Sequence, residues 1–441
     1  MTPFEIGIGS VILIVVMIYA GLYIPVALGL VSFLGVWIIR DDIEIAINML
    51  ALAAADTVSH QVFATVPLFA MMGLIVSKAG LGNDVYKVAN FIFYKVRGGL
   101  GIATVAANAV FAAITGSSIA SASVFARVSV PEMRKFGYTT RFSVGVVAGS
   151  SVLGMIIPPS AMLIIYAITA DQSVGQLFLA GIIPGVLLAV AFALAIVIMA
   201  RFWPKFVGGH GIVEIKEGAE DWQNLSWGDV TRLMAPIVFL VLVVLGGIYG
   251  GIVTPVEAGA AGSLVALLIA IFRRAISWRG FWDCLVETGH ITASILFLIV
   301  AASMYSRMLG FAGLPTLFQA WLDDQGYAVI GLMLIYIPML LLLGTIIDTA
   351  SMILIVAPLF LPAIEALGLD LVWFGIVTVI AAEIGLLTPP LGISCFVIKS
   401  TLNDPTIKLS DIFAGAFPFA VIMFLVLLAI IEWPQLSLAL I

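Results

Sequence analysis

Long apolar runs separated by short polar stretches follow one another from end to end of this chain. Each run approaches the roughly 20 residues that an α-helix needs to cross the hydrocarbon core of a bilayer. The runs are unbroken and do not alternate in polarity, which argues against a membrane β-barrel. The pattern predicts an all-α polytopic membrane protein of about ten spans, with 4–39 left open as one span or two. The spans are placed near residues 4–20, 22–39, 45–76, 142–169, 177–201, 233–250, 252–272, 282–309, 372–398 and 412–432.

The composition supports this prediction and excludes several other classes of protein. Of the 441 residues, 63% are hydrophobic and 10% are charged, too few charges for a soluble surface. Cys284 and Cys395 predict no disulfide framework, and the three histidines lack metal-ligand spacing. The net charge of −6 does not indicate nucleic-acid binding. We expect residues 204–232, the longest polar stretch, to form a cytoplasmic linker with Trp222 and Trp227 on an amphipathic arm.

The two halves of the chain carry the same motifs in the same order. Ile18–Gly29 reads IYAGLYIPVALG and Ile248–Gly259 reads IYGGIVTPVEAG, with six identical positions. Three further pairs follow, each about 230 residues apart: AGL at 79–81 and 312–314, TGSSIASAS at 115–123 and LGTIIDTAS at 343–351, and Gly-x-x-x-Pro-Pro at 154–159 and 385–390. Four matched motifs in one order predict an internal repeat.

Basic residues, which accumulate in cytoplasmic loops, place the two repeats in opposite orientations. Loops 77–98 and 127–141 each hold four Lys or Arg, whereas their counterparts 311–327 and 358–371 hold none. The bias reverses at loop 272–280, which holds three arginines where its counterpart in the first half is acidic. The chain is therefore expected to consist of two inverted-topology repeats.

Each repeat is also expected to contain a re-entrant hairpin. Basic loops flank residues 100–126 on both sides, so this segment should begin and end in the cytoplasm, and 328–357 should enter from outside in the same way. A single long span is the alternative for each segment, but it would put one basic loop on the wrong side. Each repeat then has about five spans and one hairpin. The predicted domains are residues 1–203 for the first repeat, 204–232 for the linker and 233–441 for the second repeat.

Two of the spans contain a proline pair near the middle. GMIIPPS at 154–160 lies within the segment 142–169, and GLLTPPL at 385–391 lies within 372–398. Two adjacent prolines remove two amide donors and break a continuous helix. Non-helical backbone survives at membrane depth where protein, water or an ion satisfies its carbonyl groups. The two breaks therefore predict cation sites built from backbone oxygens.

Each proline pair is expected to face the tip of its own hairpin. Both tips are rich in small and hydroxyl residues, whose oxygens suit a dehydrated Na⁺. These residues are Thr115, Gly116, Ser117 and Ser118 in the first tip, and Gly344, Thr345 and Thr349 in the second. Close helix packing would explain one such tip. Two related tips, each with its own break, favour cation sites.

Charged side chains within apolar segments are the other candidates, because a charge there is costly unless it is paired or hydrated. Asp348 lies at the second tip, where we expect it to face a substrate cavity between the tips. Glu257 and Arg307 are interpreted as structural ion-pair residues, with substrate contact as the alternative. Asp348 and Glu383 could also carry protons, which leaves Na⁺ or H⁺ coupling open.

At GSSIASAS, PEMRKFGY and GMIIPPSAMLIIYAI, and again at DTASMILIVAP and GLLTPPLGIS, the chain resembles the large membrane subunit of tripartite ATP-independent periplasmic (TRAP) transporters. The resemblance covers essentially the whole chain. It implies an elevator-type fold and a secondary active transporter that imports organic anions, such as C4-dicarboxylates or sialic acids, with a Na⁺ gradient. It also implies two partners, a separate small four-helix membrane subunit and a periplasmic substrate-binding protein, and a place in the bacterial inner membrane.

The resemblance also implies ligands for two Na⁺ sites, largely through backbone oxygens. With the tip residue Gly116 added, the first site comprises Thr115, Gly116, Ser117, Gly154, Ile157 and Pro159. The second site comprises Gly344, Thr345, Gly385, Thr388 and Pro390. Thr115 departs from the small residue or serine expected at its position. The residues expected to contact the anion are Ser118, Ser160, Asp348, Thr349 and Ser351, and Glu383 joins Glu257 and Arg307 as a structural or transport-related charge.

The sequence thus predicts a Na⁺-coupled anion transporter and not an enzyme. A membrane enzyme would need a nucleophile–base or metal constellation, and a passive channel would need a continuous polar pore. The nearer alternative is a self-sufficient Na⁺- or H⁺-coupled anion transporter that works without a binding protein. Backbone carbonyls and short hydroxyl side chains would serve many carboxylates, so no single anion is predicted.

Overall fold

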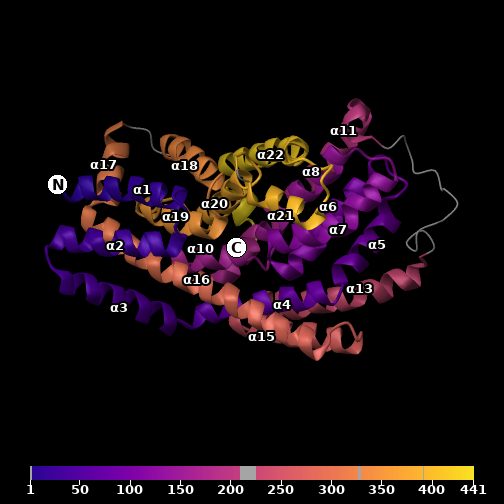
Figure 1. Ribbon diagram of the computed structural model, residues 1–441, viewed down its shortest axis with the longest axis horizontal. Helices are drawn as coiled ribbons and strands as arrows, with labels where there is room; N and C mark the ends of the chain where they lie inside the picture. The colour runs from indigo at the N-terminus through magenta and orange to yellow at the C-terminus, as the bar shows by residue number, and fades with distance from the viewer. Residues whose placement is uncertain (1, 209–224, 326–328, 391) are drawn as a thin grey trace.

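The computed structural model describes residues 2–208, 225–325, 329–390 and 392–441 (Figure 1). Its regular elements are helices, and the one β-type contact among the described residues is an isolated bridge between Tyr138 and Gly208. Seven of the described helices are long and apolar enough to cross a membrane. The segments Thr140–Ile156 and Ala161–Thr169, bent by 44°, would together make an eighth span. The predicted all-α polytopic fold is confirmed.

Helices from the start of the chain pack against helices from its middle. The 35-residue helix α16 lies along α2, α3 and α4, while α15 lies along α4 and α1 packs on α2. We call this group the scaffold bundle; its long helices run along the lower side of Figure 1. Its members are α1 (Pro3–Tyr19), α2 (Ile24–Arg40), α3 (Ile43–Ser59), η1 (Gln61–Ala64), α4 (Thr65–Lys78), α13 (Trp227–Val241), the π-helical turn η2 (Leu242–Gly246), α14 (Gly247–Tyr249), α15 (Pro255–Phe272) and α16 (Trp278–Ala312).

The remaining helices are arranged around two helix–turn–helix units, which lie where the sequence predicts hairpins. The first is α6 (Gly99–Thr115) with α7 (Ser118–Lys135), and the second is α18 (Val329–Gly344) with α19 (Thr349–Ala366). The first packs on α8 and the second on α20. We call this group the hairpin bundle. Its other members are α5 (Leu81–Phe93), α8 (Thr140–Ser151), α9 (Leu153–Ile156), α10 (Ala161–Thr169), α11 (Val174–Phe202), α12 (Pro204–Val207), α17 (Leu314–Gln325), α20 (Leu371–Gly385), α21 (Ile393–Leu402), α22 (Leu409–Glu432) and α23 (Gln435–Leu438).

Glycines let helices from the two halves of the chain meet backbone to backbone. Gly145 of α8 faces Gly415 of α22, and a Cβ atom on Gly145 would lie 2.2 Å from the carbonyl carbon and oxygen of Gly415. No larger residue fits at this crossing without moving the helices apart. Close approach through glycine is a common way for membrane helices to pack, since lipid gives no hydrophobic incentive to bury large side chains.

The structure corrects the predicted spans in two respects. Residues 45–76 are not one helix: α3 ends at Ser59, His60 has extended backbone, and η1 leads into α4. Pro67 lies in the first turn of α4, where it has no amide to bond the Phe63 carbonyl. The predicted loops 77–98 and 311–327 contain helices α5 and α17. Residues 4–39 form two helices, α1 and α2.

The helix boundaries around the linker also differ from the sequence prediction. Helix α13 begins at Trp227, six residues before the predicted span near 233–250, and its capping box joins Ser226 to Asp229. Trp227 contacts the ring of Phe91 edge to face. Trp222 and most of the linker lie outside the described residues. Trp227 thus begins a helix of transmembrane length, Trp227–Tyr249.

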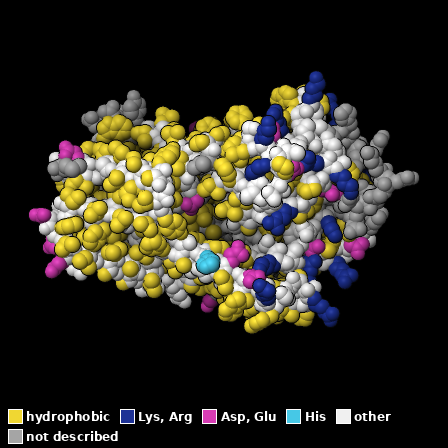
Figure 2. Space-filling model, viewed as in Figure 1, with side chains coloured by type: hydrophobic (Ala, Val, Ile, Leu, Met, Phe, Trp, Pro, Cys, Tyr) yellow, Lys and Arg dark blue, Asp and Glu magenta, His cyan; other side chains and the backbone are white. Residues whose placement is uncertain are grey.

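Charged and apolar side chains occupy different parts of the surface (Figure 2). Lys and Arg gather at the end that carries α5 to α8 and α21, whereas Asp and Glu mark the opposite end. Between the ends, large apolar side chains such as Trp37, Ile38 and Leu52 are exposed over α2 and α3. An apolar belt of this kind suits contact with lipid, and the basic end corresponds to the side that membrane proteins turn to the cytoplasm.

Candidate transport site

The first hairpin tip touches the first proline break through backbone atoms. Helix α6 ends at Thr115, and the next residue, Gly116, turns the chain with a φ of +57°. Ser117 caps α7 by accepting a hydrogen bond from Ala120 N at 3.3 Å. Ala161 N, just after the break, donates to the Gly116 carbonyl at 3.4 Å. A Cβ atom on Gly116 would lie 2.5 Å from the Pro159 carbonyl oxygen. The tip can therefore approach the break this closely only because residue 116 is glycine.

The break itself separates α9 from α10 and deprives one carbonyl group of its helical donor. Pro158 stands where an amide would normally bond the Gly154 carbonyl, so the helix cannot satisfy that oxygen. Gly154 also faces the tip, since a Cβ atom there would lie 3.0 Å from the Ser117 carbonyl oxygen. The Ser160 hydroxyl donates to the Met155 carbonyl and accepts from Leu163 N, which starts α10. The break is thus held in a fixed non-helical shape.

Two hydroxyl groups of the first tip differ in their hydrogen bonding. Thr115 Oγ1 donates to the Phe111 carbonyl at 3.0 Å, as threonine does within a helix. Ser118 Oγ is buried and has no hydrogen-bond partner among the described residues. Buried polar atoms in proteins are normally satisfied, so an orphaned hydroxyl indicates a place for a bound ion, water or ligand group. Ser118 is therefore the strongest side-chain candidate at this tip.

The second tip is joined to its broken helix by a glycine–glycine contact. A Cβ atom on Gly344 would lie 2.7 Å from the Cα atom of Gly385, where α20 ends. Thr388 Oγ1 lies 2.9 Å from the Ile384 carbonyl and 2.8 Å from that of Gly385, and Thr345 Oγ1 donates to the Leu342 carbonyl. The structure thus brings Gly344 and Gly385 together, whereas the hydroxyls of Thr345 and Thr388 bond within their own segments. Pro390 is exposed here, whereas Pro159 in the first break is buried.

A buried carboxyl group lies beside the second tip. Glu383 of α20 is fully buried, and its Oε1 accepts a hydrogen bond from Thr349 Oγ1 at 2.8 Å. Its other oxygen, Oε2, has no hydrogen-bond partner among the described residues. Asp348, by contrast, caps α19: it accepts from the backbone amide and the hydroxyl of Ser351. Glu383 therefore contributes an unsatisfied oxygen, while the oxygens of Asp348 are used locally.

A cavity with a volume of about 460 Å³ lies between the two bundles. The scaffold bundle contributes α3, η1 and α16, and the hairpin bundle contributes α10, the turn after it and α19. Its lining is both polar and apolar. The lining residues are Asp56, Thr57, His60, Val62, Phe63, Ala167, Ile168, Thr169, Asp171, Gln172, Ile299, Ala302, Ser303, Ser306, Arg307, Leu354 and Pro358.

An ion pair lies in the wall of this cavity. Arg307 of α16 places Nη2 2.5 Å from Oδ2 of Asp56 on α3. The side chains are 32% and 45% exposed, so water reaches both groups. His60 and Asp171 also line the cavity. The cavity thus contains one permanent positive charge, which a small anion could contact if the guanidinium were free.

The residues predicted to contact the anion are not those that line the cavity. Ser118, Ser160, Thr349 and Ser351 are buried and Asp348 is half-buried, at the ends of α7, α10 and α19. Their roles as substrate contacts stay predictions. Asp56 was not among the predicted site residues, although an acidic residue inside the apolar segment 45–76 is the sequence signal for it.

The pairing expected for Glu257 is wrong in the structure. The sequence interpretation made Glu257 and Arg307 structural ion-pair residues, but Arg307 pairs with Asp56. Glu257 instead closes a capping box at the start of α15: its Oε2 accepts from Thr254 N at 2.8 Å, and Thr254 Oγ1 accepts from Glu257 N. The Thr-x-x-Glu pattern at 254–257 is the sequence signal for this arrangement.

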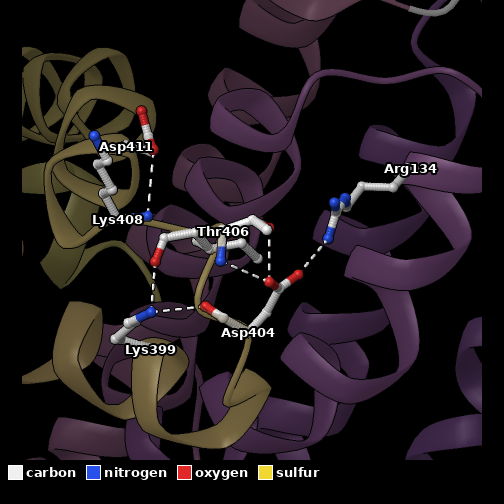
Figure 3. Close-up of polar contacts among 7 residues, drawn as sticks. Arg134, Lys399, Asp404, Thr406, Lys408 and Asp411 are labelled. Atoms are coloured by element: carbon white, nitrogen blue, oxygen red, sulfur yellow. Dashed lines mark hydrogen bonds and ion pairs between the residues drawn. The ribbon is translucent and has the colours of Figure 1, made fainter.

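A polar cluster near the basic end of the molecule ties the second half to the first hairpin (Figure 3). Asp404, in the turn between α21 and α22, accepts from Thr406 N at 2.8 Å and from Arg134 Nη1 of α7 at 2.8 Å. Lys399 Nζ donates to the carbonyls of Asp404 and Ile407. These contacts fix the turn after the second broken helix to the base of the first hairpin.

This cluster makes the stability of the folded protein depend on pH in the acidic range. Hydrogen bonds from Thr406, and then the Arg134 guanidinium, lower the pKa of Asp404 to about 2. Because the folded pKa is depressed, the stabilisation is present above the ordinary aspartate pKa of about 4 and is lost as the pH falls towards 2. We expect Asp404→Asn to lower the melting temperature at neutral pH by a few degrees, with the difference shrinking below about pH 4. A melting series in detergent checks this.

Arg134→Gln is the control for that series, because it removes the guanidinium but leaves the two Thr406 bonds. It should reproduce part of the loss and keep part of the pH dependence. A difference between wild type and Asp404→Asn that stays constant from pH 7 to pH 3 would contradict the assignment.

With the cavity and the two breaks described, the chain can be compared with known proteins. A sequence profile of the family described as "Tripartite ATP-independent periplasmic transporter, DctM component" matches residues 11–436. The chain belongs to this family. It is therefore a TRAP transporter large permease subunit, a multi-pass membrane protein and not an enzyme.

Several DctM-family relatives match this permease over most of its length. It is 31% identical to the C4-dicarboxylate TRAP transporter large permease protein DctM of Pseudomonas aeruginosa, over 94% of this chain and 93% of that protein. The sialic acid protein SiaM of Vibrio cholerae is 28% identical, covering 98% of both. The ectoine TRAP transporter large permease protein TeaC of Halomonas elongata is 32% identical, and the match covers 85% of this chain and 84% of TeaC. Relatives whose names specify chemically different substrates are thus similar to this permease over most of their sequence.

A solved structure resembles the permease in fold. The YdaH transporter of Alcanivorax borkumensis superposes with a TM-score of 0.61, covering 89% of this chain and 90% of that one. The sequences are 14% identical, so the likeness concerns the fold alone. It supports a polytopic helical fold.

Proposed function

We propose that this permease subunit carries a small organic anion across the membrane through the cavity lined by Arg307. The observation that carries the proposal is a guanidinium group inside a cavity of about 460 Å³ between two helix bundles. Arginine binds carboxylates through paired, charge-assisted N–H···O bonds. Two of the relatives' names specify a C4-dicarboxylate and sialic acid, which are carboxylates. The proposed cargo is therefore the class of small carboxylates, with no member preferred.

Na⁺ is proposed as the coupling ion, bound at the two contacts between tip and break. Two observations support this, the orphaned Ser118 hydroxyl and the orphaned Glu383 Oε2, together with the helical amide that Pro158 withholds from the Gly154 carbonyl. Each lies where a hairpin tip meets a broken helix, and oxygen atoms are the ligands that hard cations take. A cation in these positions would satisfy groups that the protein leaves unsatisfied. Bound Na⁺ would then hold each tip against its break.

An elevator movement is the transport step that fits the position of the cavity. One wall belongs to the scaffold bundle and the other to the hairpin bundle, so a displacement between the bundles would move the cavity's contents. Within the hairpin bundle, the Gly145–Gly415 crossing and the Asp404 cluster join the two halves firmly. The proposed movement therefore carries both tips together against the scaffold bundle.

The family description implies further components. A tripartite transporter includes two other parts, which we propose to be a small four-helix membrane subunit and a periplasmic protein that delivers the anion. The exposed apolar belt supports contact with lipid and with the small subunit, and the proposed location is the bacterial inner membrane.

Reconstitution into proteoliposomes tests the proposal as a whole. Uptake of labelled succinate and N-acetylneuraminate would be measured with the small subunit present, with or without the binding protein, under separate Na⁺ and proton gradients. Uptake that needs both the Na⁺ gradient and the binding protein is the expected result. Uptake that ignores Na⁺ would remove Na⁺ coupling, and full uptake without a binding protein would favour a self-sufficient transporter.

The cation sites make a specific prediction for two substitutions. Ser117→Ala and Thr388→Val should each raise the Na⁺ concentration for half-maximal uptake by about three- to tenfold, since each removes a hydroxyl where tip and break meet. Ser173→Ala is the matched control: Ser173 also caps a helix, α11, through Gln176 N, but not at a tip. Unchanged Na⁺ activation in both test variants would remove the tip assignment.

A further inference from the structure

The Asp56–Arg307 pair is the one ion pair among the described residues whose two members both line the transport cavity. The two side chains come from different scaffold helices, α3 and α16, and meet through Arg307 Nη2 and Asp56 Oδ2. Arg307 makes its side-chain hydrogen bond to this carboxylate. In the structure, the group best suited to bind a carboxylate cargo is therefore already bound to a carboxylate of the protein.

We propose that Asp56 is an internal counter-ion that the cargo's carboxylate displaces from Arg307. The inference rests on the proposed function, in which Arg307 contacts the anion. An aspartate side chain and a small carboxylate present the same pair of oxygens to the guanidinium, so they compete for the same donors. Both partners are partly exposed, at 32% and 45%, which allows exchange with an incoming anion. Binding is then a replacement of one carboxylate by another.

Such a counter-ion neutralises the charge of Arg307 when no anion is bound. A permanently charged guanidinium at membrane depth is costly without a partner, and Asp56 supplies one. The cost of separating the pair is subtracted from the affinity for the cargo, so the cavity holds its anion less tightly than a bare arginine would. Weaker binding favours release on the receiving side. Asp56 is thus a residue that sets affinity and not a direct contact of the cargo.

Displacement would also change the environment of the break between α3 and η1. Asp56 is three residues from the end of α3, where Ser59 Oγ donates to its carbonyl oxygen and His60 begins the extended turn. Once released, the carboxylate faces a cavity that already contains Asp171. The released charge favours movement of this helix end or entry of a cation. Anion binding is thereby linked to the scaffold wall of the cavity.

Chemical modification of Arg307 tests the proposal with a defined probe. The full-length permease in detergent and Na⁺ buffer would be treated with phenylglyoxal, and the fraction of modified Arg307 followed by peptide mass spectrometry while succinate is titrated. Arg134, paired with Asp404 far from the cavity, is the internal reference. The test variant is Asp56→Asn, which removes the competing charge. The control is Asp171→Asn, which makes the same change at a cavity residue that is not the ion-pair partner of Arg307.

The expected result is a lower succinate concentration for half-protection in Asp56→Asn, by about three- to tenfold, together with faster modification without succinate. Asp171→Asn should shift half-protection by less than about twofold. Equal shifts in both variants, or no shift in Asp56→Asn, would overturn the displacement while leaving Arg307 as an anion contact. Absence of protection in wild type and Asp56→Asn alike would overturn the anion site itself, and the displacement with it.

Discussion

Gly116→Ala is expected to abolish Na⁺-driven uptake while leaving the protein in the membrane. The new Cβ atom would lie 2.5 Å from the Pro159 carbonyl oxygen, closer than any unstrained contact, so the tip must move away from the break. The substitution also forces alanine into a left-handed conformation, which costs about 1–2 kcal/mol. Loss of the tip–break contact should remove the first cation site. Uptake in proteoliposomes, measured across a range of Na⁺ concentrations, checks this.

Gly313→Ala separates the two effects of that substitution. Gly313 ends α16 with a φ of +69°, but a Cβ atom there would meet nothing within 4 Å. It therefore imposes the same backbone cost without a collision. Uptake by Gly313→Ala should remain substantial, with a small loss of thermal stability. If the two variants transported equally well, close contact between tip and break would not be required for transport.

Arg307→Gln is expected to lose transport at cargo concentrations that saturate the wild type. Glutamine has a similar reach but no charge, and charge-assisted hydrogen bonds contribute about 1.5–3 kcal/mol, or roughly 10- to 100-fold in affinity. The loss should appear as a raised KM for the anion, with the Na⁺ dependence unchanged. Initial uptake rates measured against cargo concentration distinguish this from a general defect.

Arg273→Gln controls for the removal of an ion pair as such. Arg273 pairs with Asp84, between the scaffold and hairpin bundles and outside the cavity lining. It should affect thermal stability as much as Arg307→Gln does, but not KM. Arg307→Lys, which keeps the charge and loses the planar fork, should lie between wild type and glutamine. A normal KM in Arg307→Gln would remove the anion site from this cavity.

The features that the sequence predicted well depend on local chemistry. Apolar runs locate most of the helices because lipid imposes both their length and their composition. The proline pairs locate both breaks, because a missing amide interrupts a helix wherever it occurs. The repeated small residues at Thr115–Ser118 and Gly344–Thr349 locate the turns of both helix–turn–helix units, and the structure places Gly116 and Gly344 against their breaks.

The cavity could not be predicted because it depends on how distant helices pack. Asp56 and Arg307 are 251 residues apart in sequence, and no local pattern pairs them. The cavity's other wall comes from α10, which follows the first break, and from α19, which follows the second tip. The lining residues of both helices lie several residues after the break or the tip. The residues predicted as substrate contacts lie at the tips and the break, apart from the residues that line this cavity, and their roles stay predictions. The break at His60 was missed because no glycine or proline stands at residues 59–61 to mark it.

The contact between Gly145 and Gly415 determines the height of the first broken helix relative to α22, a helix of the second half. Gly145 precedes Gly154 by nine residues, which is roughly 14 Å of helix. If the helices slid along one another, a side chain next to one glycine would collide with the opposite backbone. Helices α8 and α22 therefore keep one relative height in the bilayer. A residue inserted between Gly145 and the break would rotate and lift one ion position while leaving the other in place. Alignment of the two halves thus depends on a fixed segment length as much as on the residues that surround the ions.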